Sequence, residues 1–100
     1  MALRLAWSPE AVEDVEAIAA YIERDSPWYA SAVVSRIINA AESIPEQPEM
    51  GRIVPEIDRP DVRERFAYSY RLIYRVGKRR ILVVAVIHGN RLLQSPRLRT

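Results

Sequence analysis

The chain has 100 residues, of which 49% are hydrophobic and 28% charged, and its formal net charge is +2. This length and composition fit one globular domain over residues 1–100 and exclude a disordered tail. The chain has no cysteine and one histidine, which excludes disulfides and thiolate metal sites. We therefore expect a protein with neither a metal nor a cofactor.

Hydrophobic residues form no long uninterrupted segment. The longest apolar run covers residues 81–87, far below the roughly 18 residues of a membrane span. The first residues also lack the apolar core of a signal peptide. We expect a cytoplasmic protein without a membrane partner.

Charge is divided unevenly along the chain. Residues 1–61 contain five basic and twelve acidic residues, a charge of −7, whereas residues 62–100 contain ten basic residues and one acid, +9. A basic half raises the local concentration of anions, so this division predicts a negatively charged partner.

Two helices are predicted after a short strand within residues 3–7. Ser8 and Pro9 are typical of a helix start, and the apolar spacing that follows predicts a helix from about Pro9 to Glu23. The Ser-Pro pair at 26–27 repeats the signal for a second helix, which Pro45 ends. The short connection predicts an antiparallel helical hairpin.

Three strands are predicted in the second half, after a proline-rich ordered loop at 45–61. Residues 62–66 and 70–76 alternate between apolar and polar, whereas residues 80–87 are apolar on both sides, as in a strand buried on both faces. The order β-α-α-β-β-β predicts an α+β fold, with the helical hairpin packed on a small curved antiparallel sheet.

Arginines alternate along two of these strands. Arg63 and Arg65 share one side of their strand, and Arg71 and Arg75 share the polar side of the next. If the apolar side of each strand packs on the helices, all four arginines lie together on the opposite, open face. We expect this face to bind the negatively charged partner, with Arg71 exposed.

Histidine and tyrosine side chains have two readings each. His88 closes the last strand, either bonded to a carbonyl or acting as a general base. Tyr70 and Tyr74 either face the core with a polar tip or stack on bases. The chemistry of these residues leaves both readings open.

The two tryptophans and the tail are further candidates. Trp7 and Trp28 are expected to be packing anchors at helix ends. Arg97 and Arg99 follow Pro96 and either frame a target-binding surface or belong to a solvated terminus.

With these elements in place, the chain resembles the RelE/ParE superfamily of bacterial type II toxins. The resemblance covers nearly the whole length and is carried by SPEA, PEMGRIVPE, VRERF, YRLIYRV and VVAVIHGNRLL. It implies a β-α-α-β-β-β domain and a cognate antitoxin with which the chain forms a hetero-oligomer. It also implies one of two activities: RelE-like members cut mRNA in the ribosomal A site, and ParE-like members block DNA gyrase.

The nuclease branch has a tyrosine about six residues beyond its last arginine, and this chain has none there. The matching arginines here would be Arg63, Arg65, Arg71 and Arg91, with His88 as proton carrier. The position of the tyrosine is occupied by Arg97, which supplies a cation but transfers protons poorly.

The missing tyrosine favours a ParE-like protein that acts by binding gyrase rather than as an enzyme, with a ribosome-dependent mRNA endonuclease as the alternative. An acidic and apolar antitoxin segment is expected along the sheet edge or across the hairpin. The expected target-binding residues are Arg63, Arg65, Arg71, Arg75, Arg91 and Arg97.

Overall fold

A computed structural model describes residues 3–99 of the chain. It contains two α-helices, five strands and three short 3-10 helices, labelled η. In chain order these are β1 (Arg4–Trp7), α1 (Pro9–Glu23), α2 (Pro27–Ser43), η1 (Ile44–Glu46), η2 (Pro48–Met50), β2 (Arg52–Ile53), β3 (Val62–Ala67), β4 (Tyr70–Val76), β5 (Arg80–His88) and η3 (Ser95–Arg99).

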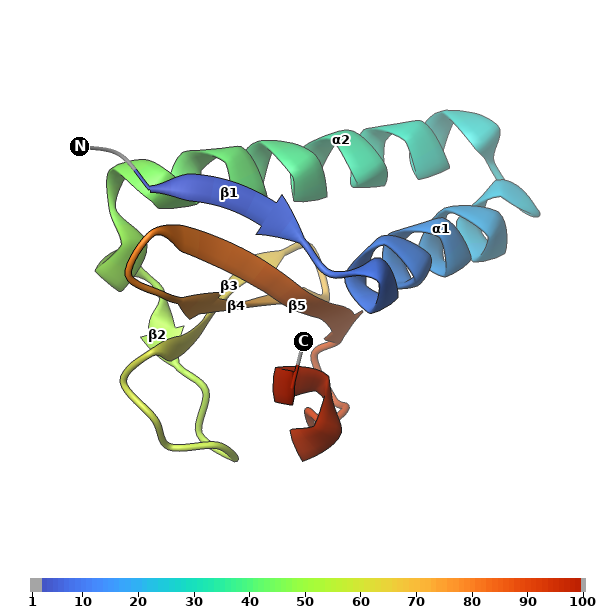
Figure 1. Cartoon of the computed structure of the whole chain (residues 1–100). Helices are drawn as coiled ribbons and strands as arrows, with labels where there is room; N and C mark the ends of the chain where they lie inside the picture. Colours follow the sequence, from blue (N-terminus) through green and yellow to red (C-terminus); the bar gives the residue numbers. More distant parts are fainter. Residues whose placement is uncertain (1–2, 100) are drawn as a thin grey trace.

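The five strands form one sheet in the order β1-β5-β4-β3-β2, and both helices lie on the same side of it (Figure 1). The predicted α+β fold with a helical hairpin on the sheet is confirmed. The sheet is mixed rather than wholly antiparallel, because β1 pairs in parallel with β5. The proline-rich loop also contributes a strand, the two-residue β2, which pairs with β3.

Both long helices begin at the predicted serine caps. The Ser8 Oγ accepts a hydrogen bond from the Ala11 N–H at 3.1 Å, and the Ser26 Oγ accepts one from the Tyr29 N–H at 3.1 Å. Each cap satisfies a donor that the first helical turn cannot pair. Local chemistry therefore fixes the start of each helix.

A first hydrophobic core fills the space between the helices and the sheet. Tyr74 is fully buried there, and its hydroxyl donates to the Pro48 carbonyl at 2.8 Å. Trp7 packs against this core, as predicted. Tyr70 also packs there, which agrees with the first of its two readings. Trp28 does not, because its side chain is 79% exposed, so its predicted role as a packing anchor is wrong.

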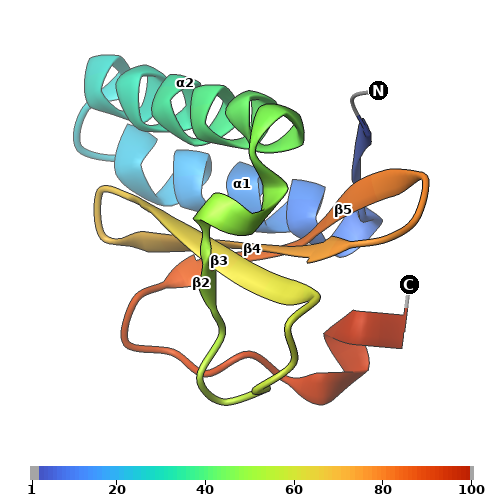
Figure 2. The same cartoon turned by 90° about the vertical axis from the view of Figure 1, so that its left-hand side faces the viewer.

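A second hydrophobic core covers the opposite face of the sheet. Figure 2 shows the segment after β2 and the chain beyond β5 lying against this face. Val54 and Leu93 come from these two segments and are buried against Ile73 and Val84 of the sheet, with Leu98 packed beside them. The expectation that this face is open is therefore wrong.

A β-bulge in β5 adapts the sheet to its two cores. The pairing with β4 shifts between Ile73 and Tyr74. These two residues stand opposite Ala85 and Val83, so no β4 residue stands opposite Val84. Val84 and Ala85 both join the second core. The prediction that this strand is buried on both faces is confirmed, since residues 81–86 are all buried.

Replacing Gly51 with alanine is expected to lower the free energy of unfolding by about 1–3 kcal/mol, the usual cost of overpacking. A Cβ at this position would overlap the Tyr74 hydroxyl and lie 2.8 Å from the Glu64 carbonyl oxygen. Urea denaturation measures the loss. Gly77→Ala is the control, because its nearest atom is 3.1 Å away; equal losses would contradict the close approach.

Candidate target-binding site

Arg63 and Arg65 of β3 lie on the same side of the sheet as the helices. They stand opposite Tyr74 and Leu72 of β4, which belong to the first core. The Arg63 guanidinium donates to the carbonyls of residues 49, 51 and 60, at 2.9 to 3.1 Å. The Arg65 guanidinium donates to the Ser43 hydroxyl at 2.6 Å and to the residue 47 carbonyl. Both arginines therefore hold the loop that follows α2.

Arg71 lies on the other side of the sheet and is buried, with 4% of its surface exposed. Its Nε donates to the fully buried Glu64 carboxylate at 2.6 Å, and its Nη atoms donate to both Glu56 oxygens at 2.7 and 2.9 Å. These contacts raise the pKa of Arg71, with Glu56 as the main cause. The prediction that Arg71 is exposed is wrong, because two carboxylates enclose it.

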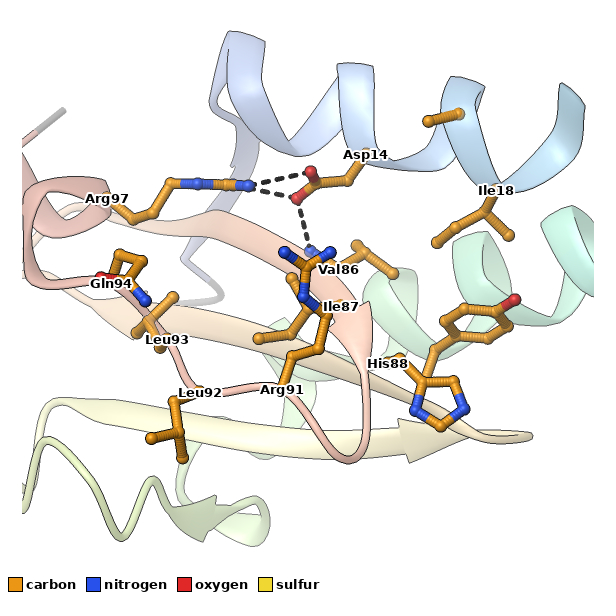
Figure 3. Close-up of a pocket in the computed structure, with 12 residues that line it drawn as sticks. Asp14, Ile18, Val86, Ile87, His88, Arg91, Leu92, Leu93, Gln94 and Arg97 are labelled. Carbon is orange, nitrogen blue, oxygen red and sulfur yellow. Dashed lines mark hydrogen bonds and ion pairs between the residues drawn. The ribbon is translucent and has the colours of Figure 1, made fainter. Parts of the chain in front are cut away.

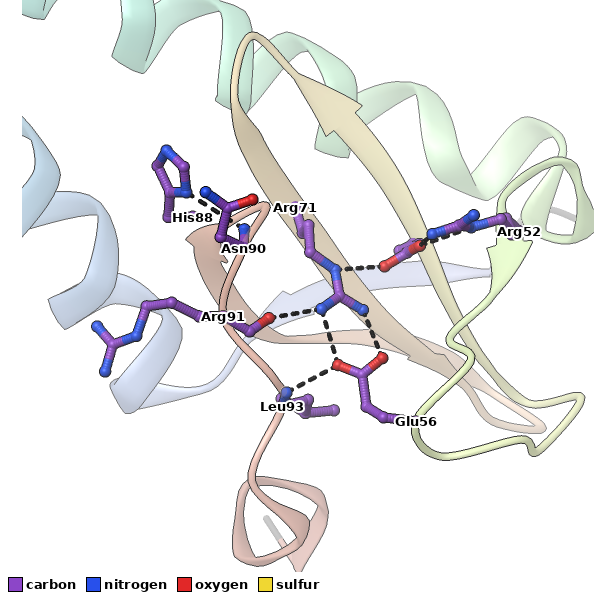
Figure 4. Close-up of polar contacts among 8 residues, drawn as sticks. Arg52, Glu56, Arg71, His88, Asn90, Arg91 and Leu93 are labelled. Carbon is purple, nitrogen blue, oxygen red and sulfur yellow. Dashed lines mark hydrogen bonds and ion pairs between the residues drawn. The ribbon is translucent and has the colours of Figure 1, made fainter.

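The Arg71 network also fixes the chain that follows β5 (Figure 4). Arg71 Nη1 donates to the Arg91 carbonyl at 2.7 Å, and the Leu93 N–H donates to Glu56 Oε2 at 2.8 Å. Together these bonds hold the main chain of residues 91–93 against the sheet. We infer that the buried Arg71 side chain positions residues 91–93.

Acidification is expected to destabilise the protein as Glu56 becomes protonated. The Arg71 and Leu93 hydrogen bonds lower the pKa of Glu56 from 4.5 to about 2. A lowered folded-state pKa gives stability that is present above pH 4.5 and is lost as the pH falls toward 2, on the order of 3 kcal/mol. Thermal denaturation between pH 7 and pH 2 measures this loss.

The control for this acid effect is the exposed pair of Arg59 with Asp61. Asp61 also has a lowered pKa, chiefly through its hydrogen bonds from Arg59, but its side chain is 38% exposed. Glu56→Gln should flatten the acid dependence much more than Asp61→Asn. Equal flattening by the two variants would contradict the role given to Glu56.

Arg97 joins the C-terminal turn to α1 and to β5 (Figure 3). Its two Nη atoms donate to the Asp14 carboxylate at 2.9 Å each, and Nη1 also donates to the Val84 carbonyl at 3.0 Å. The Val86 N–H donates to Asp14 Oδ2 at 2.9 Å. Since β1 pairs with β5 only as far as Val83, this ion pair covers the strand edge that β1 leaves open.

Arg75 is likewise engaged. It stands on the same side of the sheet as Arg71, and its Nη1 donates to the carbonyl of Leu98 in η3. Arg75 thus ties the C-terminal turn to β4. The tail is therefore packed against the sheet as far as Leu98, rather than solvated.

An open cleft of about 520 Å³, which we call the C-terminal cleft, lies between α1, the end of β5 and the chain after it. The Arg91 side chain is exposed here and rises toward α1 (Figure 3), and Leu92 beside it is 67% exposed. Within residues 3–99 the Arg91 guanidinium has no hydrogen bond or ion pair. The lining residues are Asp14, Ala17, Ile18, Tyr70, Val86, Ile87, His88, Arg91, Leu92, Leu93, Gln94 and Arg97.

His88 is exposed at the rim of the cleft. Its Nδ1 accepts a hydrogen bond from the Asn90 N–H at 3.2 Å. The side chain is therefore bonded to a backbone N–H and not, as one of its two readings had it, to a carbonyl. Its ring and the ring of Tyr70 are nearly perpendicular, with ring centres 6.0 Å apart. Burial raises the pKa of Tyr70.

The predicted shared arginine face does not exist. Arg63 and Arg65 lie on one side of the sheet, and Arg71 and Arg75 on the other. The physical reason is the second core: the apolar side of β3, with Val62, packs there and not on the helices. Of the six predicted target-binding arginines, Arg91 alone, among the described residues, presents a guanidinium without a protein partner.

Glu56 belongs to the Arg71 network, and the sequence alone does not point to it. It lies in the proline-rich loop, 15 residues before Arg71, and no periodicity relates the two. The position of Glu64 is different. It lies between Arg63 and Arg65 in a strand, so alternation predicts that its side chain lies on the face opposite to theirs.

A sequence model of one protein family matches residues 5–93 of the chain. Its description is "ParE toxin of type II toxin-antitoxin system, parDE". The chain belongs to the ParE toxin family. The C-terminal cleft and the Arg71 network are therefore features of a ParE-family toxin, and the predicted membership of the RelE/ParE superfamily is confirmed.

One curated relative has a similar sequence over part of its length. The protein "Putative toxin Y4kP" of Sinorhizobium fredii (strain NBRC 101917 / NGR234) is 41% identical over 49 residues, which are 49% of this ParE-family chain and 51% of that protein. The match thus spans about half the length of that relative.

Solved structures share the fold of this ParE-family toxin. A chain of the chromosomal ParDE toxin-antitoxin system from P. aeruginosa has a TM-score of 0.71 at 21% identity, covering 86% of this chain and 95% of that one. The YoeB dimer from Staphylococcus aureus has a TM-score of 0.60 at 19% identity, covering 88% and 98%. The YoeB-YefM complex from Staphylococcus aureus has a TM-score of 0.56, also at 19% identity and with the same coverage.

The part of the chain that the structure describes has neither a metal-binding cluster nor a membrane-spanning helix. Residues 3–99 contain no group of three or more histidine or acidic side chains arranged to hold a metal ion. Neither helix in this range is both long and apolar enough to cross a bilayer.

Proposed function

We propose that this toxin inhibits DNA gyrase by binding it through the C-terminal cleft, and that a cognate antitoxin neutralises it. The separation of the four arginines expected for a nuclease carries the proposal. Arg63 and Arg65 bind loop carbonyls on one side of the sheet, and Arg71 is enclosed by carboxylates on the other. Of these four arginines, Arg91 alone remains to meet a phosphate, and phosphoryl transfer in RNA needs several cations around one charge.

Proton transfer is also poorly served at the position of the nuclease tyrosine, which Arg97 occupies. Cleavage of RNA requires a group to deprotonate the 2′-hydroxyl and another to protonate the leaving oxygen. Arginine cannot do either near neutral pH. A surface with one exposed cation beside the exposed Leu92 is better suited to protein recognition, where arginine is among the residues that contribute most to binding energy.

The mRNA endonuclease is a second candidate because His88, Tyr70 and Arg91 line the same cleft. His88 could accept a proton and the Tyr70 phenol could donate one. This arrangement would replace the tyrosine that the tail lacks.

We propose that the antitoxin docks on the hairpin side of β1. Within residues 3–99 no strand pairs with the outer edge of β1, so this edge can accept an added strand. Beside it lies an apolar groove of about 310 Å³ between β1, α1 and α2, where Val12 and Ile38 are exposed. Glu16 and Glu42 also line this groove, so an apolar stretch of the antitoxin fits it better than an acidic one.

Two parallel assays test the proposed target. Purified toxin should reduce supercoiling of relaxed plasmid by purified gyrase, and adding the cognate antitoxin should restore it. Primer extension on mRNA from translating ribosomes should show no new ends. Cuts within codons, with unchanged supercoiling, would reject gyrase and support the endonuclease.

A further inference from the structure

Uncompensated positive charge gathers at the end of the sheet farthest from the C-terminal cleft. Arg4 begins β1, and Lys78, Arg79 and Arg80 form the turn and first residue leading into β5; we call these four residues the basic end. All four side chains are exposed. Within residues 3–99 none of them has a side-chain hydrogen bond or ion pair.

Strand pairing holds two of these charges side by side. Arg4 stands directly opposite Arg80 in the parallel pairing of β1 with β5, so the two side chains leave the same face of the sheet. Like charges directly opposite one another destabilise a sheet. The register is nevertheless fixed, because their neighbours Leu5 and Ile81 pack in the first core.

A small pocket of about 160 Å³ opens between these arginines. It is lined by Arg4, Leu5, Ala6, Arg79 and Arg80. A water takes about 30 Å³ of liquid volume, so the pocket has room for a single small anionic group with a few waters. Guanidinium groups bind phosphate through two parallel N–H donors, which suits such a group.

We propose that the basic end binds the phosphodiester backbone of a nucleic acid. An acidic protein segment would also be attracted, but protein interfaces depend on aromatic and apolar anchors at their centre. Among the residues that the structure describes, none of the exposed large hydrophobic side chains lines this pocket. Contacts made by arginine and lysine alone are typical of phosphate binding.

The basic end is separate from the C-terminal cleft. β5 runs from Arg80 to His88, so the two sites lie roughly 26 Å apart at about 3.3 Å per residue. The chain can therefore hold nucleic acid at one end of β5 and a protein target at the other. This inference goes beyond the proposed function and does not depend on it.

Fluorescence anisotropy over a series of salt concentrations tests the proposal with a labelled duplex DNA and a single-stranded RNA. The variant R4Q/R79Q/R80Q should bind about 10 to 100 times more weakly at low salt. Its slope of log affinity against log salt should fall by about 2 to 3, because each lost phosphate contact removes about 0.9 for duplex and 0.7 for single strands. The control R24Q/R36Q/R59Q, with the same change in net charge, should bind within about twofold of the parent.

The outcomes separate clearly once circular dichroism has shown that both variants are folded. Loss confined to R4Q/R79Q/R80Q supports the site, and the stronger of the two probes identifies the nucleic acid. Equal losses in both variants would mean diffuse attraction and would overturn it. So would displacement of the DNA by polyglutamate at the same charge concentration, since the site would then favour acidic polypeptide.

Discussion

Replacing Arg71 with methionine is expected to lower the free energy of unfolding by about 3–5 kcal/mol, the usual cost of breaking a buried ion pair. The change leaves the fully buried Glu64 carboxylate with Arg52 as its remaining ion-pair partner, and it removes the donor that holds the Arg91 carbonyl. Guanidinium chloride denaturation at pH 7 measures the loss. Growth inhibition should fall with it, because residues 91–93 lose their anchor.

Arg91→Met is the matched control for stability, because the same charge is removed from an exposed side chain. Its free energy of unfolding should stay within about 0.5 kcal/mol of the parent. Adding Glu64→Gln to Arg71→Met should recover part of the loss, since the amide carries no buried charge. If Arg71→Met is as stable as Arg91→Met, the network does not hold the fold.

Replacing Arg91 with glutamate is expected to remove most of the inhibitory activity without unfolding the protein. Reversing a charge at the centre of an interface costs about 2 kcal/mol or more, which is roughly 30-fold or more in affinity. The toxin concentration needed for half inhibition of gyrase supercoiling measures the effect. Antitoxin binding, proposed on the hairpin side of β1, should be unchanged.

Arg24→Glu supplies the control for this reversal, because Arg24 is also exposed but lies in the turn between α1 and α2. It changes the net charge by the same amount. Similar weakening by both variants would show that overall charge decides inhibition, and the cleft would lose its assignment.

The sequence predicted the helices well, because their ends depend on neighbouring residues. The Ser-Pro pairs at 8–9 and 26–27 carry the cap and the first helical residue together. The apolar residues of each helix lie on one side, and this side packs against the sheet. These signals are local, so a single sequence contains them.

The side of the sheet on which each β3 residue lies could not be read in the same way. Alternation in VRERF shows that Val62 and Glu64 share a side, but not which core that side joins. The second core depends on Val54 and Leu93, which lie in segments without a regular pattern. For a strand between two cores, alternation alone therefore allows either side of the strand to face the helices.

The candidate site was predicted only in part for the same reason. The resemblance to the RelE/ParE superfamily points to Arg91, and the structure leaves its side chain exposed. Arg71 was named from the same resemblance, but its partner Glu56 lies in a loop whose path only the folded chain defines. Ion pairs between residues far apart in the sequence decide whether an arginine is free to bind another molecule or stabilises the fold.

Photo-crosslinking at Leu92 tests most directly whether the C-terminal cleft contacts the target. A photoreactive phenylalanine derivative placed at Leu92, which is 67% exposed, is compared with the same residue at Trp28, which is 79% exposed on the hairpin. After irradiation with purified gyrase and DNA, we predict a toxin–gyrase adduct from position 92 and none from position 28. An adduct from position 28 alone would contradict the assignment of the cleft.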